Sequence, residues 1–223
     1  MTYEILEDTP YGGEIHFLTD AADLDALPVT GQKLLTAYHL AQFRDFPGAL
    51  LSLAASTELP YIAAWLRALA QAQACRLEVC LTAYSKPQVF VRYIVTEKWM
   101  PALSFQATHD LPYKTPALLC QVYALVGEIN FDGYGYAGGL LFPPDKYPDF
   151  GSYNEWRDET MPDYEGFMAF YQSWTGDLLL VNAEGQVGWW IHDDAEKCQI
   201  VGTLETVLPE LFVALGKNRP FAP

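Results

Sequence analysis

The strongest constraint on the fold is a pattern of two short strands around a glycine-containing turn, in residues 178–192. Residues 178–181 are Leu-Leu-Leu-Val, a continuous apolar run typical of a strand covered on both faces. Residues 182–185, Asn-Ala-Glu-Gly, predict a turn in which the glycine takes a left-handed conformation. The next strand alternates between two faces, with Val187, Trp189 and Ile191 on one and Gly188, Trp190 and His192 on the other. This pattern predicts a β-hairpin with one tryptophan in the core and the other against a helix or solvent.

A second hairpin is expected in the first half of the chain. Every second residue is apolar in both 76–84 and 88–95, and Ser85-Lys86-Pro87 forms the connection between them. A further short strand is expected at residues 14–18, followed by Asp20 as a helix N-cap. The sheet of this protein is therefore expected to be mostly antiparallel.

Helical spacing of apolar residues predicts five helices, at 31–46, 48–56, 61–74, 117–126 and 204–215. Pro47 is expected to end the first of them. Thr115-Pro116 predicts a hydroxyl N-cap followed by proline at the first helical position, and Gly127 is the expected stop. The last helix places Val207, Leu208, Leu211 and Leu215 on one face and ends at Gly216. The expected fold class is α+β, a curved, mostly antiparallel sheet with packed helices and an N-terminal helical and hairpin extension.

A boundary between two parts of the chain is expected near residue 110. Residues 97–113 have little periodicity and contain Met-Pro and Leu-Pro breaks. We therefore divide the chain into an N-terminal helical and β-hairpin region, 1–110, and an α+β domain, 111–223. Whether the first part folds independently or elaborates the sheet of the second stays open at this point.

The charge of the chain is −15 and is unevenly distributed. Residues 1–115 hold 12 acids and 8 bases (8 − 12 = −4), and residues 116–223 hold 16 acids and 5 bases (5 − 16 = −11). A nucleic-acid-binding protein needs the opposite sign. An acidic half attracts a basic protein or serves solubility alone, and both alternatives remain open.

The sequence favours a soluble cytoplasmic protein with no membrane partner, metal or cofactor. No apolar run approaches the ~18–20 residues of a membrane-spanning helix, and the acidic start MTYEILEDTP lacks the basic region of a signal peptide. Cys75, Cys80, Cys120 and Cys198 have no CxxC spacing, so we expect reduced, mostly buried thiols rather than a zinc site.

An acidic and aromatic region, residues 128–167, is the candidate for binding a protein partner. It holds nine acids against two bases, together with aromatic residues that include Tyr134, Tyr136, Tyr147, Phe150, Tyr153, Trp156 and Tyr164. Aromatic side chains often anchor protein interfaces, and carboxylates steer a cationic partner. The alternative is that several aromatics belong to the core and the acids form a solvated rim. The predicted partner-binding residues are Asp132, Tyr134, Tyr136, Asp149, Tyr153, Glu155, Trp156, Asp158, Glu159, Asp163 and, from the hairpin, Trp190.

No catalytic residue is predicted. His109-Asp110 with Ser104 resembles the composition of a catalytic triad, but the chain has no Gly-x-Ser-x-Gly elbow. His39 is expected on the polar flank of a helix, at the surface or its boundary. The glycine-rich residues 132–139 lack the lysine of a phosphate-binding loop, and the acids around residues 158–165 match no calcium loop.

The order of motifs in residues 110–216 resembles the SUKH superfamily, bacterial domains that include many immunity proteins of toxin systems. The similarity rests on the proline-initiated helix, Leu140-Leu-Phe-Pro-Pro, Gly176-Asp177 before an apolar strand, Gly185-Gln-Val187 after the turn, and the last helix. The chain departs from the family where Val126-Gly127 stands in place of Asn-Gly. The resemblance implies an α+β domain that binds and blocks a toxin without catalysis.

The sequence therefore predicts a non-catalytic module, an immunity protein that occludes the active or binding surface of a basic toxin domain. Two other functions remain open. One is a regulatory or adaptor scaffold, in which the N-terminal helices bind one protein and the C-terminal part another. The other is a small hydrolase that uses His109 or His39.

Overall fold

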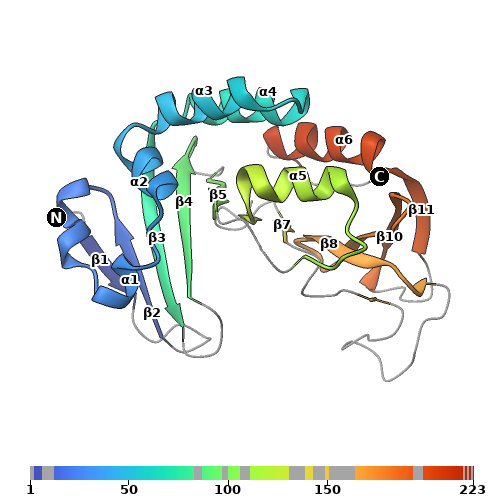
Figure 1. Ribbon diagram of the computed structural model, residues 1–223, viewed down its shortest axis with the longest axis horizontal. Helices are drawn as coiled ribbons and strands as arrows, with labels where there is room; N and C mark the ends of the chain where they lie inside the picture. Colours follow the sequence, from blue (N-terminus) through green and yellow to red (C-terminus); the bar gives the residue numbers. More distant parts are fainter. Residues whose placement is uncertain are drawn as a thin grey trace. The chain divides into compact units, whose positions relative to one another are not determined.

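The computed structural model describes residues 3–6, 13–82, 87–96, 100–105, 111–130, 139–142, 149–150, 164–192, 198–217, 219, 221 and 223. The fold class is α+β, with helices packed on antiparallel strands (Figure 1). The chain forms two compact units, Met1–Phe105 and Gln106–Pro223. The sequence places the boundary after residue 110, whereas the structure divides after Phe105.

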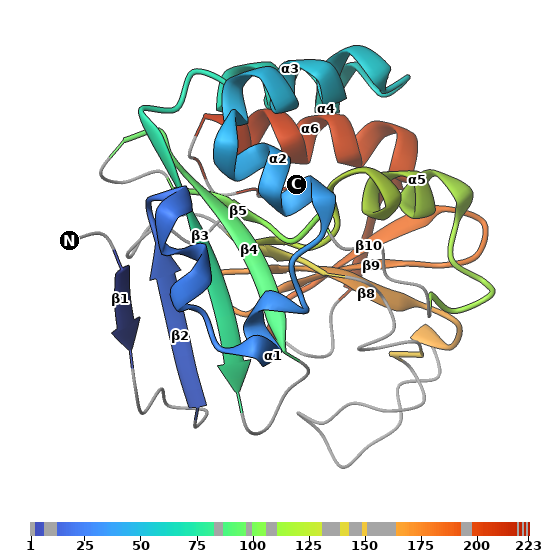
Figure 2. The same ribbon diagram turned by 60° about the vertical axis from the view of Figure 1, so that its left-hand side comes forward.

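The first unit contains a sheet in which each strand pairs antiparallel with the next one along the chain (Figure 2). Its strands are β1 (Tyr3–Leu6), β2 (Gly13–Leu18), β3 (Ala74–Thr82), β4 (Gln88–Ile94) and β5 (Ala102–Leu103). The predicted strand at 14–18 and the predicted hairpin are confirmed as β2 and as β3 with β4. The periodicity did not reveal β1 or β5.

One face of this sheet forms the core of the first unit. Leu18 lies opposite Leu77, which lies opposite Val91, and all three side chains are fully buried. Tyr93 lies on the same face, and its hydroxyl donates to Gln42 Oε1 at 3.0 Å. This polar contact fixes the position of a helix on the sheet, because a buried phenol needs a hydrogen-bond partner.

The opposite face of the sheet carries a buried carboxylate between two arginines. Arg92 donates to Glu78 through Nε at 2.6 Å and through Nη2 at 2.9 Å, and Arg76 Nε donates to the same carboxylate at 2.6 Å. The Arg76 guanidinium also lies over the Phe17 ring, 4.7 Å from its centroid. The charge of Glu78 is thus fully compensated, as burial requires.

Five helical segments belong to the first unit: η1 (Ala21–Ala26), α1 (Val29–Gln32), α2 (Ala37–Arg44), α3 (Phe46–Ser56) and α4 (Pro60–Leu69). The predicted N-cap Asp20 is confirmed, since its side chain accepts from Ala22 N–H. Segments η1, α1 and α2 contact the sheet, and α3 packs against α4 (Figure 2).

The prediction of one continuous helix over 31–46 is wrong. The chain leaves the helical path between α1 and α2, where Thr36 begins α2 by accepting a hydrogen bond from His39 N–H at 3.3 Å. Asp45 then caps α3, with its carboxylate 3.3 Å from Gly48 N. Pro47 therefore stands in the first turn of α3, where a missing N–H costs nothing, rather than ending the preceding helix.

The second unit contains a further antiparallel sheet and two helices that lie side by side on one of its faces (Figure 1). The strands are β6 (Ile129–Asn130), β7 (Gly139–Leu141), β8 (Met168–Ser173), β9 (Leu178–Val181), β10 (Gln186–Trp190) and β11 (Cys198–Thr203), each paired with the next. The predicted hairpin is confirmed as β9 and β10. All four residues of β9 are buried, and Gly185 takes the left-handed conformation with φ 81°.

The helices of the second unit are α5 (Ala117–Val126) and α6 (Leu204–Gly216). The predicted stripe of Val207, Leu208, Leu211 and Leu215 is confirmed as the buried face of α6. Gly127 ends α5 with φ 69°, as expected. The start of α5 differs from the prediction, because Pro116 occupies the N-cap position. The Thr115 hydroxyl instead faces the Met168 sulfur at 4.0 Å.

The C-terminal end folds back onto the second unit. Arg219 N–H donates to Ala214 O at 3.0 Å, which turns the chain after α6. Phe221 is then buried, with its ring edge-on to Tyr171 and Trp189 at centroid distances of 6.4 and 6.2 Å. The ring of Trp189, the other tryptophan of the hairpin, is thus partly covered by Phe221.

Candidate functional site

Most of the predicted partner-binding residues lie outside the described part of the chain. These are Asp132, Tyr134, Tyr136, Tyr153, Glu155, Trp156, Asp158, Glu159 and Asp163. The structure describes two of the predicted residues, Asp149 and Trp190, and they have different roles.

Trp190 belongs to the core. Its side chain is 1% exposed, and its ring meets that of Phe150 edge-on at a centroid distance of 5.2 Å. Phe142, Leu178 and Leu180 belong to the same buried group, which we call the Trp190 cluster. The placement of Trp190 on a partner-binding surface is therefore corrected. Phe142 and Phe150, from the part of the chain before β8, cover this tryptophan.

Asp149 and Phe150 anchor one end of the acidic, aromatic region. Asp149 Oδ1 accepts from Gly166 N–H at 3.2 Å, and Phe150 N–H donates to Phe167 O at 2.7 Å. Phe167 packs against the same cluster as Phe150. Two positions far apart in the region are thereby held together on a close-packed surface. For Phe150, the alternative that aromatics of this region belong to the core holds.

The anchored ends enclose residues 151–163. In sequence this segment carries Glu155, Asp158, Glu159 and Asp163 against the single base Arg157. It also carries Tyr153 and Trp156. A charged segment whose two ends are fixed loses less entropy on binding than a free chain of the same composition. The described residues on either side of this segment, Asp149 and Phe150 before it and Gly166 and Phe167 after it, are joined by two hydrogen bonds.

The Gly176-Asp177 motif forms a network of hydrogen bonds between two parts of the second sheet, which we call the Asp177 lock. The Asp177 carboxylate accepts from Thr175 Oγ1 at 2.8 Å and from His192 N–H at 3.1 Å. Asp177 N–H donates to Ser173 Oγ at 3.0 Å. Gly176 has φ 95°, and a side chain there would meet the His192 ring at 3.4 Å. The motif thus joins the β8–β9 turn to the end of β10.

Sequence reasoning did not identify this lock. Ser173, Thr175 and Asp177 are spaced two residues apart, a pattern from which side chains often bond to nearby main chain. That spacing was available as a signal, but the contact with His192 depends on the hairpin. The lock also resembles a catalytic triad in residue types, yet Ser173 Oγ is already bonded to Asp177 N–H and to Thr175 Oγ1.

His39 is fully buried, which corrects its predicted place at the surface. Its Nδ1 accepts from Thr36 N–H at 3.1 Å, so the proton lies on Nε2, which donates to Ser104 O at 2.5 Å. Burial lowers the pKa of His39, and the hydrogen bond to Ser104 opposes this effect in part. Both ring nitrogens are occupied by main-chain partners, so His39 has no nitrogen left for general base catalysis. His109 and Asp110 lie outside the described residues.

Burial favours the neutral form of three described thiols. Burial raises the pKa of Cys75, Cys80 and Cys198 to about 11 each. Since the thiolate is the nucleophile and the metal ligand, these cysteines are poorly suited to either role. Across the described part of the chain, no group of three or more His, Cys, Asp or Glu side chains is arranged to hold a metal ion.

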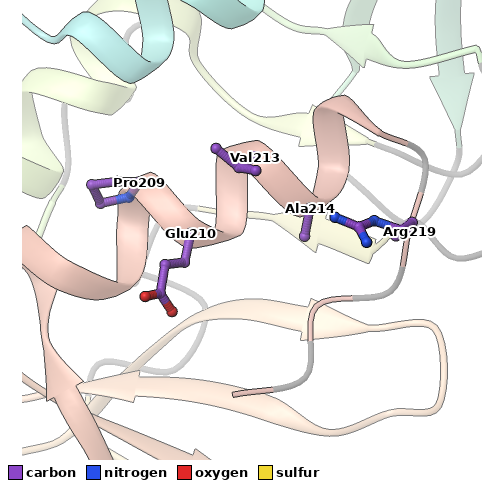
Figure 3. Close-up of a pocket in the computed structure, with 5 residues that line it drawn as sticks. All are labelled: Pro209, Glu210, Val213, Ala214 and Arg219. Carbon is purple, nitrogen blue, oxygen red and sulfur yellow. The ribbon is translucent and has the colours of Figure 1, made fainter.

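A shallow groove of about 260 Å³ lies on α6, on the side opposite its buried stripe (Figure 3). It is lined by Pro209, Glu210, Val213, Ala214 and Arg219. The floor is apolar and lacks convergent polar groups, so it does not resemble a small-molecule site.

The structure thus defines an α+β protein of two compact units, in which His39, Ser173 and Asp177 are hydrogen-bonded within the fold. Comparison with protein-family models, with curated proteins and with solved structures finds no match. No helix in the described residues is long and apolar enough to cross a membrane.

Proposed function

We propose that this protein is a non-catalytic module that binds a basic protein partner and blocks its working surface. The SUKH resemblance makes the proposal more specific: the partner is a toxin domain, and the chain is its immunity protein. The acidic segment 151–163 supplies the contact and steers the partner, since complementary charges speed association.

One observation carries the proposal. The hydrogen bonds from Phe150 to Phe167 and from Gly166 to Asp149 join the two ends of the acidic segment on the Trp190 cluster. In sequence, the segment between these ends carries four carboxylates against one base. The second half of the chain, with its charge of −11, adds to the same field.

The polar residues of the described core support a role without catalysis. His39 is bonded at both ring nitrogens, and Ser173 is bonded within the Asp177 lock. The thiols with raised pKa values are poor nucleophiles at neutral pH. A hydrolase would have to draw its machinery from other residues, and nothing in the described geometry favours that function.

The test is partner capture followed by charge reversal. The tagged chain is incubated with lysate of its source at low and moderate salt, and bound proteins are identified by mass spectrometry. We expect one stoichiometric basic partner whose binding weakens as salt rises. The variant carrying Asp158→Lys, Glu159→Lys and Asp163→Lys should associate about 10-fold or more slowly and show a weaker salt dependence.

A matched control reverses three other exposed acids, Asp25→Lys, Glu58→Lys and Glu210→Lys. This variant has the same net charge as the first, so a general effect of charge would slow both equally. Unchanged association of the first variant, or equal slowing of both, would exclude segment 151–163 as the contact.

A further inference from the structure

The outer edge of β11 is open among the described residues of the second unit. Strand β11 pairs with β10 on one side, and no described strand pairs with its other side. Gln199 and Ile200 are exposed, and the Ile200 side chain is 59% exposed. An open edge offers main-chain donors and acceptors to an added strand.

The direction of the free main-chain groups follows from one hydrogen bond. Cys198 N–H donates to Tyr164 Oη at 3.0 Å, so the polar groups of Cys198 point away from β10. The main-chain N–H and C=O groups of successive residues point to opposite sides of an antiparallel strand. Those of Gln199 therefore point towards β10, and those of Ile200 point outwards. Val201 is the extra residue of a β-bulge opposite Val187 and Gly188. The alternation of main-chain direction therefore holds from Cys198 to Ile200.

Ile200 is therefore the centre of the open edge. Its N–H and C=O face outwards and have no partner in the described part of the chain. The Tyr164 hydroxyl already occupies the neighbouring donor, Cys198 N–H. An added antiparallel strand would exchange two hydrogen bonds with Ile200. Because only these main-chain groups are open, the site would contact only a few residues of the partner.

The composition of β11 also favours pairing. Its sequence, Cys-Gln-Ile-Val-Gly-Thr, contains no charge and no proline, which are the usual means of protecting an edge. The exposed carboxylates Glu184 and Glu205 lie near its C-terminal end, since Leu204 N–H donates to Gly185 O at 2.9 Å.

We propose that the open edge of β11 binds an extended, positively charged segment of the protein partner by strand addition centred on Ile200. This inference rests on the proposed function and adds a second contact to it. The exposed carboxylates Glu184 and Glu205 near the C-terminal end of the strand favour cationic residues in the added segment. A second copy of this chain is disfavoured at this edge, because each copy carries a charge of −15.

The first test needs no natural partner. The ¹⁵N-labelled full chain is titrated with an eight-residue peptide of alternating lysine and valine, and separately with its glutamate and valine counterpart. We expect the lysine peptide alone to shift the amide signals of Gln199, Ile200 and Val201 and to slow exchange of the Ile200 amide about tenfold. Shifts confined to other residues, or no shift at these three amides, would overturn strand addition at β11.

The second test compares two lysine substitutions of exposed apolar residues in the same unit. Ile200→Lys places a charge on the open edge, and Val213→Lys places it on the solvent face of α6, where Val213 is 50% exposed. Ile200→Lys should weaken lysine-peptide binding about tenfold, and Val213→Lys should leave it unchanged. Ile200→Pro removes the outward donor while keeping the inner ladder, and should have the same effect.

The two proposals fail in different ways. If the lysate yields no partner, the proposed function is wrong, and the peptide titration still decides the inference. If a captured partner binds Ile200→Lys, Ile200→Pro and the native chain equally, the added-strand contact is wrong and the acidic segment remains. A self-associated chain that is broken up by Ile200→Lys would also overturn the proposal, because the occupant would be a second copy.

Discussion

His39 Nε2 lies 2.5 Å from the main-chain oxygen of Ser104, and this bond joins the first turn of α2 to the residue that follows β5 directly. The other ring nitrogen accepts from Thr36 N–H, so one imidazole both caps a helix and holds a distant segment. The histidine thereby organises these two segments of the first unit.

Replacing this histidine should destabilise the first unit. His39→Ala removes a buried ring and its hydrogen bonds, and should lower the free energy of unfolding by about 2–4 kcal/mol. Amide exchange in α2 measured by mass spectrometry would show the loss directly. The adjacent, exposed Tyr38→Ala should change the free energy by less than about 0.5 kcal/mol. Equal effects of the two variants would refute the organising role.

The pH dependence of stability should reveal the same residue. Burial holds the pKa of folded His39 below the value of 6.5 that it has when unfolded. Its unfolded form therefore binds a proton more readily, and stability falls as the pH drops below that value towards the folded pKa. Urea midpoints compared at about pH 7.5 and about pH 5.5 should differ less in His39→Gln than in the native chain. An unchanged difference would assign the pH dependence to other groups.

The anchoring of the acidic segment predicts a large effect of Phe150→Ala. The substitution leaves a cavity beside Trp190 and should cost about 3–5 kcal/mol of the stability of the second unit. Tryptophan fluorescence during urea unfolding measures this loss. Tyr113→Ala is the control, because Tyr113 is exposed and should tolerate truncation within about 0.5 kcal/mol. A cost as small as that of the control would contradict the described packing.

The Asp177 lock should contribute a smaller, measurable stability. Asp177→Ala removes the acceptor of Thr175 and of His192 N–H, and should cost about 1–3 kcal/mol. Faster amide exchange of His192 is the specific signature of the broken contact. Glu184→Ala, in the turn that joins β9 to β10, serves as the comparison, and it should leave that amide unchanged. If both variants behave alike, the lock has no special role.

The raised thiol pKa values predict slow chemical labelling. At about pH 8 a thiol of pKa about 11 is roughly one part in a thousand thiolate, so Cys75, Cys80 and Cys198 should react slowly in the folded protein. Labelled peptides quantified by mass spectrometry, with and without urea, test this expectation. Rapid labelling of any of the three without urea would show that its site opens.

The sequence predicts the elements whose signal is local. The alternation in β3, β4 and β10 and the stripe on α6 each lie within one element, and the structure has them as expected. The break between α1 and α2 was missed because its capping box, Thr36 with His39, has a histidine where Glu or Gln is usual. The contact that holds the His39 ring in place, with Ser104 O, lies 65 residues away. Helical periodicity runs through such a break without showing it.

For the candidate site, too, the sequence predicts the features with a local signal and misses those that depend on distant contacts. Composition identifies the acidic, aromatic region, but it does not decide which aromatics are exposed. Phe150 and Trp190 are buried because each covers the other, and this contact exists only once β10 and the preceding segment are both in place. The strand β11 was missed because its six residues lack strict alternation, and its ladder with β10 defines it.

Within each unit, the spatial order of the strands follows their order in the chain. During synthesis, each new strand therefore meets a partner edge that is already present. The sheet of the first unit is complete once Leu103 has left the ribosome, while the second unit is still to be made. Growth then runs strand by strand to β11, so the last strand to form is also the one whose outer edge is open among the described residues.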